Sequence, residues 1–337
     1  MRFTEDKVRK TIQVIEQQMT KTLFEIKDIT YTECGYKEFE KDKEYDFKPF
    51  DPEAFKLNTD GEAHFWFKMK VKTPEKQAHK AHYLRVVTGP LYTWDAHNPQ
   101  GLIYLDEEMT QSFDINHHYV HIESGREYDA KIYFYKNGAN SALNFIPQVL
   151  ETDERVEALF YDMNVPYLAA LEFDKDSKEH IEPIKYLSRA CDLLDLRNPG
   201  DEAFFESVEK ARKFLKEEFY EKVCGKSEET VYCIGHTHID VAWLWRLRQT
   251  CEKAQRSFAT VLNLMKDYPE YKFMSSQPQL YKYVEKEDPR LFEEIQKRVT
   301  VFAALHNNGV SLANAMPSIQ KGKVSSDHNG GILGCSH

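Results

Sequence analysis

The sequence lacks any long hydrophobic run, although 41% of its 337 residues are hydrophobic. No stretch reaches the roughly 18 apolar residues that a membrane-spanning helix needs. The first residues, MRFTEDKVRKTIQVIEQQM, carry charges throughout, whereas a signal peptide has an unbroken apolar core of about 7–15 residues. The composition therefore predicts a globular protein of two or three domains with no membrane partner.

Positive charge is also in short supply, because 45 Lys and Arg stand against 55 Asp and Glu and give a formal net charge of −10. Non-specific nucleic-acid binding needs clustered Lys and Arg, so no nucleic-acid partner is expected. No phosphate-binding glycine loop is present. The cysteines form no C-x-x-C pair, which favours reduced thiols in a cytoplasmic protein. They are Cys34, Cys191, Cys224, Cys233, Cys251 and Cys335.

The first part of the chain changes from a helical to a strand-like pattern. Residues 5–28 carry apolar side chains at a helical period. From about 62 to 136, short segments such as FWFKMKV alternate between an apolar face and a face with Trp66, Lys68 and Lys70, and turn-rich pieces separate them. Short strands at this spacing predict an antiparallel β-sandwich.

The second part predicts helices, followed by alternating strands and helices. Residues 151–223 carry helical apolar stripes, and Pro166 is expected to break or kink the first helix. VYCIG has the apolar run of a buried strand, and residues 249–267 have the pattern of an amphipathic helix. YKFMSSQPQL predicts a second strand that ends in a polar loop, and RLFEEIQKRV predicts another helix. This alternation is typical of the start of an α/β domain.

The segment GHTHIDVAWLW contains the strongest candidate site. In an extended chain, His236, His238 and Asp240 point to one face. Imidazole nitrogen and carboxylate oxygen suit Zn²⁺ or another divalent metal, and ligands bind at the carboxyl ends of strands in α/β domains. A surface or hydrogen-bonding role for each residue is the alternative. The tryptophans that follow can be core residues or can stack on a sugar ring.

Other candidate residues carry weaker signals. His117, His118 and His121 do not all share one strand face, so a solvated or hydrogen-bonded role is favoured over a common metal. Tyr92 and Trp94 could form a sugar platform, and packing in the sandwich is an equal alternative.

Residues 235–299, from GHTHIDVAWLWRLRQTCEKAQ to RLFEEIQKRV, closely resemble the start of the catalytic domain of glycoside hydrolase family 38, the class II α-mannosidases. NPQGLIYLD and LLDLRNPG resemble the amino-terminal regions of its cytosolic and bacterial branch. The resemblance implies a multidomain α+β protein. An N-terminal helix and antiparallel β-sandwich would be followed by a helical linker region and the incomplete start of an α/β, seven-stranded-barrel-like catalytic domain.

The resemblance also implies the roles of the site residues. His238 and Asp240 would hold Zn²⁺ or a related divalent ion, and Trp243 would line the floor of the mannose subsite. His236 lies in the motif without being clearly a ligand and is expected to lie deeper, as a hydrogen-bonding partner behind the metal pair. The implied substrate is an α-mannoside or a mannose-containing oligosaccharide, cleaved by a retaining mechanism with two carboxylates. The full-length protein is a possible homo-oligomer.

The sequence departs from the family pattern near Val299. Between Val299 and Gln320 there is no charged residue, no tryptophan follows Trp245, and the only acidic residue after Glu294 is Asp327. The family's nucleophile segment contains Trp, Glu and Asp, so no catalytic residue is assigned, and a frameshift or truncation is expected to leave the chain inactive. The predicted division is 1–60 N-terminal helix and loop, 61–150 β-sandwich, 151–226 helical region, 227–299 start of the catalytic domain, and 300–337 aberrant tail.

Two other functions stay open. An amidohydrolase-like metal hydrolase also carries H-x-H after its first barrel strand, and both histidines would then bind metal. A non-catalytic carbohydrate-binding protein would explain the sandwich and the missing acids.

Overall fold

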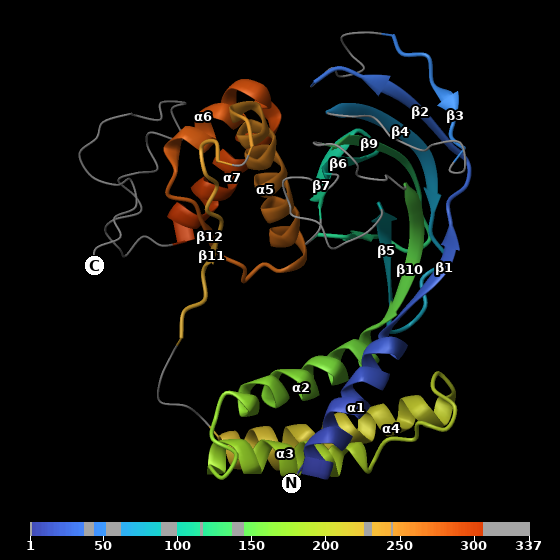
Figure 1. Cartoon of the computed structure of the whole chain (residues 1–337), viewed down its shortest axis with the longest axis vertical. Helices are drawn as coiled ribbons and strands as arrows, with labels where there is room; N and C mark the ends of the chain where they lie inside the picture. The colour runs from blue at the N-terminus through green and yellow to red at the C-terminus, as the bar shows by residue number, and fades with distance from the viewer. Residues whose placement is uncertain are drawn as a thin grey trace, which may run out of the picture.

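The chain forms a mixed α+β structure in which a helical bundle, a β-sandwich and a helix-rich lobe lie beside one another (Figure 1). The structure, a computed structural model, describes residues 2–36, 44–51, 62–88, 100–114, 117–136, 145–225, 231–243 and 245–305. Tyr92, Trp94 and most of the predicted tail lie outside these ranges. Among the described residues, no helix combines the length and the apolar character needed to cross a membrane.

Two antiparallel sheets face each other in the sandwich. One sheet has the order β1-β10-β5-β8, formed by Thr20–Glu25, Ile146–Asp153, Lys80–Val87 and Tyr119–Ile122. The other has the order β3-β2-β4-β9-β6-β7, formed by Lys48–Pro49, Ile29–Cys34, Ala63–Lys72, Glu127–Lys136, Gln100–Leu105 and Glu108–Phe113. The predicted antiparallel sheets are therefore confirmed.

Strand β4 shows how the alternating pattern builds the core. Phe65, Phe67 and Val71 point between the sheets and are buried. The opposite face was predicted to be solvated, but Trp66 is only 4% exposed. It packs with Leu102 and Tyr133 in a second cluster on the outside of the sheet. The sheet is buried on both faces here because a later helix covers it, which the alternation alone does not indicate.

The N-terminal helix is shorter than predicted. Helix α1 spans Arg2–Met19, and the expected continuation to residue 28 is wrong, because TKTLFE pairs as β1 with β10. Its β-branched and aromatic residues suit a strand. The sandwich therefore takes strands from residues 20–49 as well as 63–153, unlike the predicted division at residue 60.

A helical bundle follows the sandwich. It consists of α1 with α2 (Glu154–Leu171), α3 (Lys178–Cys191), α4 (Glu202–Phe214) and the π-helical η2 (Leu215–Cys224). Val8, Ile12 and Ile15 of α1 pack against Val156 and Leu159 of α2. Pro166 lies inside α2 without ending it, contrary to the predicted break. Asp153 caps α2 by accepting hydrogen bonds from the backbone N–H groups of Arg155 and Val156.

The last lobe contains β11 (Gly235–His236), α5 (Leu247–Asp267), β12 (Phe273–Met274), α6 (Pro278–Glu287) and α7 (Pro289–Leu305). The strands pair in parallel, Gly235 with Phe273 and His236 with Met274. The strand is shorter than VYCIG predicted and is not buried, since Val231 is 81% and Tyr232 82% exposed. Within the described ranges β11 has one partner strand, and no barrel is closed.

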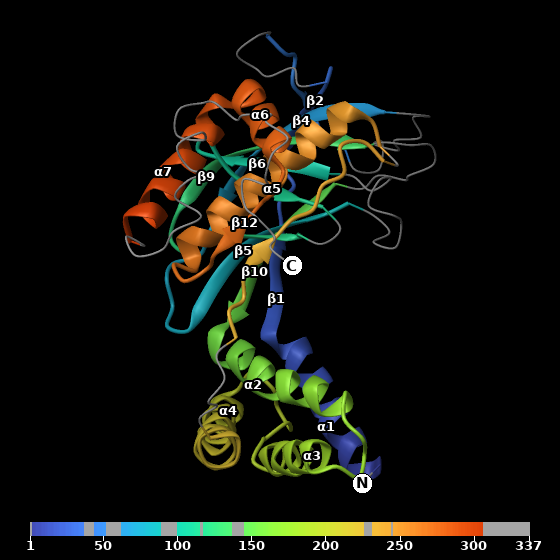
Figure 2. The same cartoon turned by 90° about the vertical axis from the view of Figure 1, so that its left-hand side faces the viewer.

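Helix α5 holds this lobe on the outer face of the six-stranded sheet (Figures 1 and 2). The contact is polar and buried. Arg256 donates to the Tyr135 hydroxyl at 3.0 Å and to the Gln100 side-chain oxygen. One turn further on, the Thr260 and Ser112 hydroxyls are 2.7 Å apart.

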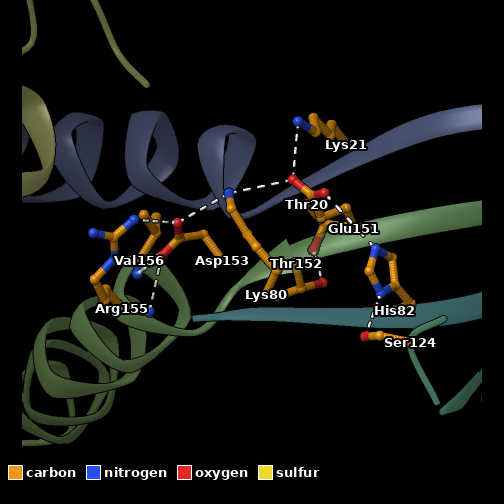
Figure 3. A network of polar contacts seen from close by, with 10 residues as sticks. All are labelled: Thr20, Lys21, Lys80, His82, Ser124, Glu151, Thr152, Asp153, Arg155 and Val156. Atoms are coloured by element: carbon orange, nitrogen blue, oxygen red, sulfur yellow. Dashed lines mark hydrogen bonds and ion pairs between the residues drawn. The ribbon is translucent and has the colours of Figure 1, made fainter. Parts of the chain in front are cut away.

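The bundle and the sandwich are joined by a buried charged network (Figure 3). Lys80 Nζ lies 3.2 Å from Glu151 Oε1 and 3.1 Å from Asp153 Oδ2. Arg155 reaches the same Asp153 oxygen at 2.7 Å. Burial alone would raise the pKa of Asp153, but hydrogen bonds from Arg155 and Lys80 outweigh it and lower the pKa to about 2. The charged carboxylate thus fixes the point where β10 becomes α2.

Replacement of Asp153 by Asn is expected to lower stability at neutral pH. The folded pKa lies below the ordinary value of 3.8. The carboxylate therefore stabilises the fold above pH 3.8, and this contribution is lost as the pH falls toward about 2. The shift corresponds to about 2 kcal/mol. Urea unfolding from pH 7 to pH 2 should show the two proteins converging at acid pH.

Asp192→Asn is the control, because Asp192 pairs with Lys7 at an exposed site. Such pairs contribute about 0–1 kcal/mol. An Asp153→Asn deficit that is independent of pH would contradict the assignment.

Candidate metal and sugar site

His238 and Asp240 lie side by side just beyond β11. His238 Nε2 is 3.3 Å from Asp240 Oδ1, and the two side chains are 70% and 45% exposed. Ile239 points the other way and is 5% exposed, packed in the apolar cluster of α5, α6 and α7. The extended alternation therefore brings the two expected ligands together.

This spacing fits a shared metal ion. Two ligand atoms each about 2.1 Å from one tetrahedral ion are about 3.4 Å apart, close to the observed separation. Within the described ranges, no group of three or more His, Cys, Asp or Glu side chains is placed to hold a metal. The pair thus offers two ligands of the kind that Zn²⁺ accepts and leaves its other positions to groups elsewhere.

His236 does not lie beneath this pair. It is exposed, and with His238 it lines a cleft of about 350 Å³ between the lobe and the sandwich. The expected deeper position is not what the structure shows. The cleft is also bordered by His117, whose Nδ1 is 2.9 Å from Asp114 Oδ1. His121 lies 3.5 Å from Asp267, so these histidines have polar partners, as the sequence favoured.

The Gln277 side chain holds the peptide between the two expected ligands. Its Oε1 accepts the Ile239 backbone N–H at 3.0 Å, and its Nε2 donates to the Ile239 carbonyl at 2.7 Å. Gln277 immediately precedes α6, and Pro278 occupies the first position of that helix.

The buried Thr250 hydroxyl organises the turn that follows. It donates to the Asp240 carbonyl at 3.1 Å and accepts the Ala242 N–H at 3.1 Å and the Trp245 indole N–H at 3.0 Å. These three bonds fill the capacity of a hydroxyl group. They support Ala242 at a φ of 70°, which is costly for a residue other than glycine.

The two tryptophans differ in environment. Trp245 is held by Thr250 and lies under Lys253, whose Nζ is 4.7 Å from the ring centroid. Trp243 is 62% exposed and contacts Trp245 edge to face at 5.8 Å. The expected sugar-binding side chain therefore presents much of its ring to solvent near the metal pair.

Comparison with known proteins supports the relationship that these residues suggested. Residues 228–303 match the model of the glycosyl hydrolases family 38 N-terminal domain. This stretch contains both expected ligands, Trp243 and the Gln277 and Thr250 contacts. Part of this chain is a family 38 N-terminal domain.

Three α-mannosidases are similar to the chain. Alpha-mannosidase G of Dictyostelium discoideum is 30% identical over 168 residues, 49% of this chain and 15% of that protein. Alpha-mannosidase of Saccharomyces cerevisiae is 28% identical over 264 residues, 68% of this chain and 23% of that protein. Human Alpha-mannosidase 2C1 is 30% identical over 142 residues, 42% of this chain and 13% of that protein. The matched part is thus less than a quarter of each relative.

Sequence reasoning did not find Gln277 and Thr250 in this family 38 segment. Thr250 lies within the predicted amphipathic helix, where nothing distinguishes it from a neutral helix residue. Gln277 lies in the predicted polar loop, and Pro278 marks a helix start there. Neither signal indicates a contact with the motif, because both contacts depend on how α5 and α6 pack against it.

Thr250→Val is expected to loosen the turn at Trp243. Valine has a similar shape but leaves the Ala242 and Trp245 N–H groups without their acceptor, at a cost of about 1–3 kcal/mol. Thr250→Ser keeps the hydroxyl and should resemble wild type in thermal unfolding and tryptophan fluorescence. Equal behaviour of the Val and Ser variants would show that the hydroxyl does not hold the turn.

Proposed function

We propose that this chain is part of a metal-dependent α-mannosidase and contributes one half of its metal site. The observation that carries the proposal is the His238–Asp240 pair, whose 3.3 Å spacing suits one ion, within the stretch that matches family 38. The similar α-mannosidases point to α-mannosides or mannose-containing oligosaccharides as substrates.

The residues of the motif have separate roles in this proposal. His238 and Asp240 hold Zn²⁺ or another divalent ion, which when bound supplies a positive centre for sugar hydroxyls. Trp243 offers an apolar face to the sugar ring. Ile239 anchors the segment on the opposite side, where the apolar cluster buries it.

The catalytic carboxylates are not assigned to this chain. A retaining glycosidase needs a nucleophile and an acid/base, each an Asp or Glu near the sugar. The family's nucleophile segment is absent from the sequence after Glu294, and the further metal ligand is expected from the same missing region. We expect the rest of the seven-stranded-barrel-like domain to supply them, in a cytoplasmic and possibly homo-oligomeric protein.

A non-catalytic carbohydrate-binding role is the second candidate. The exposed ring of Trp243 favours it, because sugar stacking needs no carboxylate. An amidohydrolase-like site fits less well. It would use both His236 and His238, whereas the structure pairs His238 with Asp240.

The purified chain is expected to show no turnover of a chromogenic α-mannoside. Without a nucleophile and an acid, the covalent intermediate and the protonated leaving group are both missing. Loss of a nucleophile alone can lower the rate by several orders of magnitude. Hydrolysis that a chelator abolishes would contradict the expected inactivity and would place catalytic residues in the described part or the tail.

Binding should persist without turnover. Calorimetry is expected to detect Zn²⁺ binding that His238→Ala or Asp240→Ala removes. Trp243→Ala should weaken methyl α-mannoside binding and leave the Zn²⁺ affinity near that of wild type, because the ring is not a ligand. Zn²⁺ affinity that is unchanged in both ligand variants would refute the metal assignment.

A further inference from the structure

Strands β11 and β12 pair over only two residues, and a side chain continues the pairing beyond them. The last main-chain pair is His236 with Met274. Three residues later, the Gln277 amide makes the next two hydrogen bonds, both to Ile239. The carboxyl ends of the strands thus separate, while the Ile239 peptide keeps a donor and an acceptor.

We propose that Gln277 is a positioning residue for the metal pair. It holds the Ile239 peptide and thereby sets the separation of His238 and Asp240. The inference rests on the proposed metal-binding function of those two residues. Gln277 lies on the side of the motif opposite to the ligand atoms, since it bonds the main chain rather than either ligand.

A primary amide is the side chain that this role requires. It carries a donor and an acceptor on one carbon atom, so it can bond both groups of one peptide. A carboxylate can only accept and would place its second oxygen against the Ile239 carbonyl. A thioether of similar size can make neither strong bond.

Ile239 is fixed at two kinds of contact. Gln277 holds its main chain, and the apolar cluster that includes Phe258 and Leu280 holds its side chain. With the side chain directed inward, the neighbouring residues on both sides must point outward in an extended segment. The main-chain bonds add the control of position along the chain that apolar packing alone does not give.

The test compares Gln277→Met with Gln279→Met in the whole chain. Gln279 is exposed, lies two residues away, and undergoes the same chemical change. Zn²⁺ alone is the probe, titrated by calorimetry, and wild type and His238→Ala are the references. Loss of groups that orient metal ligands typically weakens metal binding by 10–100-fold, which is the effect expected for Gln277→Met. Gln279→Met should bind like wild type.

Amide hydrogen exchange supplies a readout that needs no metal. The Ile239 amide should exchange at least about tenfold faster in Gln277→Met, because it loses its acceptor. The Gly235 amide, which donates to the Lys272 carbonyl at 2.8 Å, should keep its wild-type rate. Gln277→Glu retains an acceptor and is expected to protect Ile239 while still weakening Zn²⁺ binding.

The outcomes separate the two proposals. Zn²⁺ binding by wild type that Gln277→Met leaves unchanged overturns the positioning role and leaves the proposed function standing. Absence of Zn²⁺ binding by wild type overturns the metal site, and the positioning role with it. A general loss of exchange protection, Gly235 included, would show that Gln277 merely supports the fold.

Discussion

A buried polar contact between helix α5 and the outer face of the six-stranded sheet is the constraint on which the site depends. Arg256 and Thr260 are 4% and 5% exposed, and both bond partners on the sandwich. A buried guanidinium or hydroxyl that loses its partner is costly, so such contacts permit one register only. The helix therefore cannot slide or rotate on the sheet without leaving several groups unsatisfied.

The register of α5 is passed to the motif. Thr250, in the first turn of α5, bonds three groups between Asp240 and Trp245. Phe258 on the same helix packs in the cluster that buries Ile239. The sandwich, which holds no expected metal ligand, thus contributes to the position of His238 and Asp240 through one helix. This connection gives a physical reason for a long non-catalytic region before the family 38 segment.

The sequence indicated local features well. The alternation in GHTHID predicted that His238 and Asp240 share a face, and the amphipathic pattern predicted α5 to within two residues of its observed start at Leu247. Features that depend on distant partners were missed or misread. Trp66 was placed on a solvated face because nothing local shows that α5 covers it, and VYCIG was expected to be buried because its apolar run suits a strand with neighbours on both sides. Gln277 escaped notice because its partner lies 38 residues earlier.

Anomalous diffraction from crystals of the chain grown with Zn²⁺ is the most direct test of the metal assignment. We expect one peak within about 2.0–2.2 Å of both His238 Nε2 and an Asp240 carboxylate oxygen, on the side away from Ile239. A zinc ion bound elsewhere, with His238 and Asp240 turned apart, would contradict the assignment of these residues as half of a mannosidase metal site.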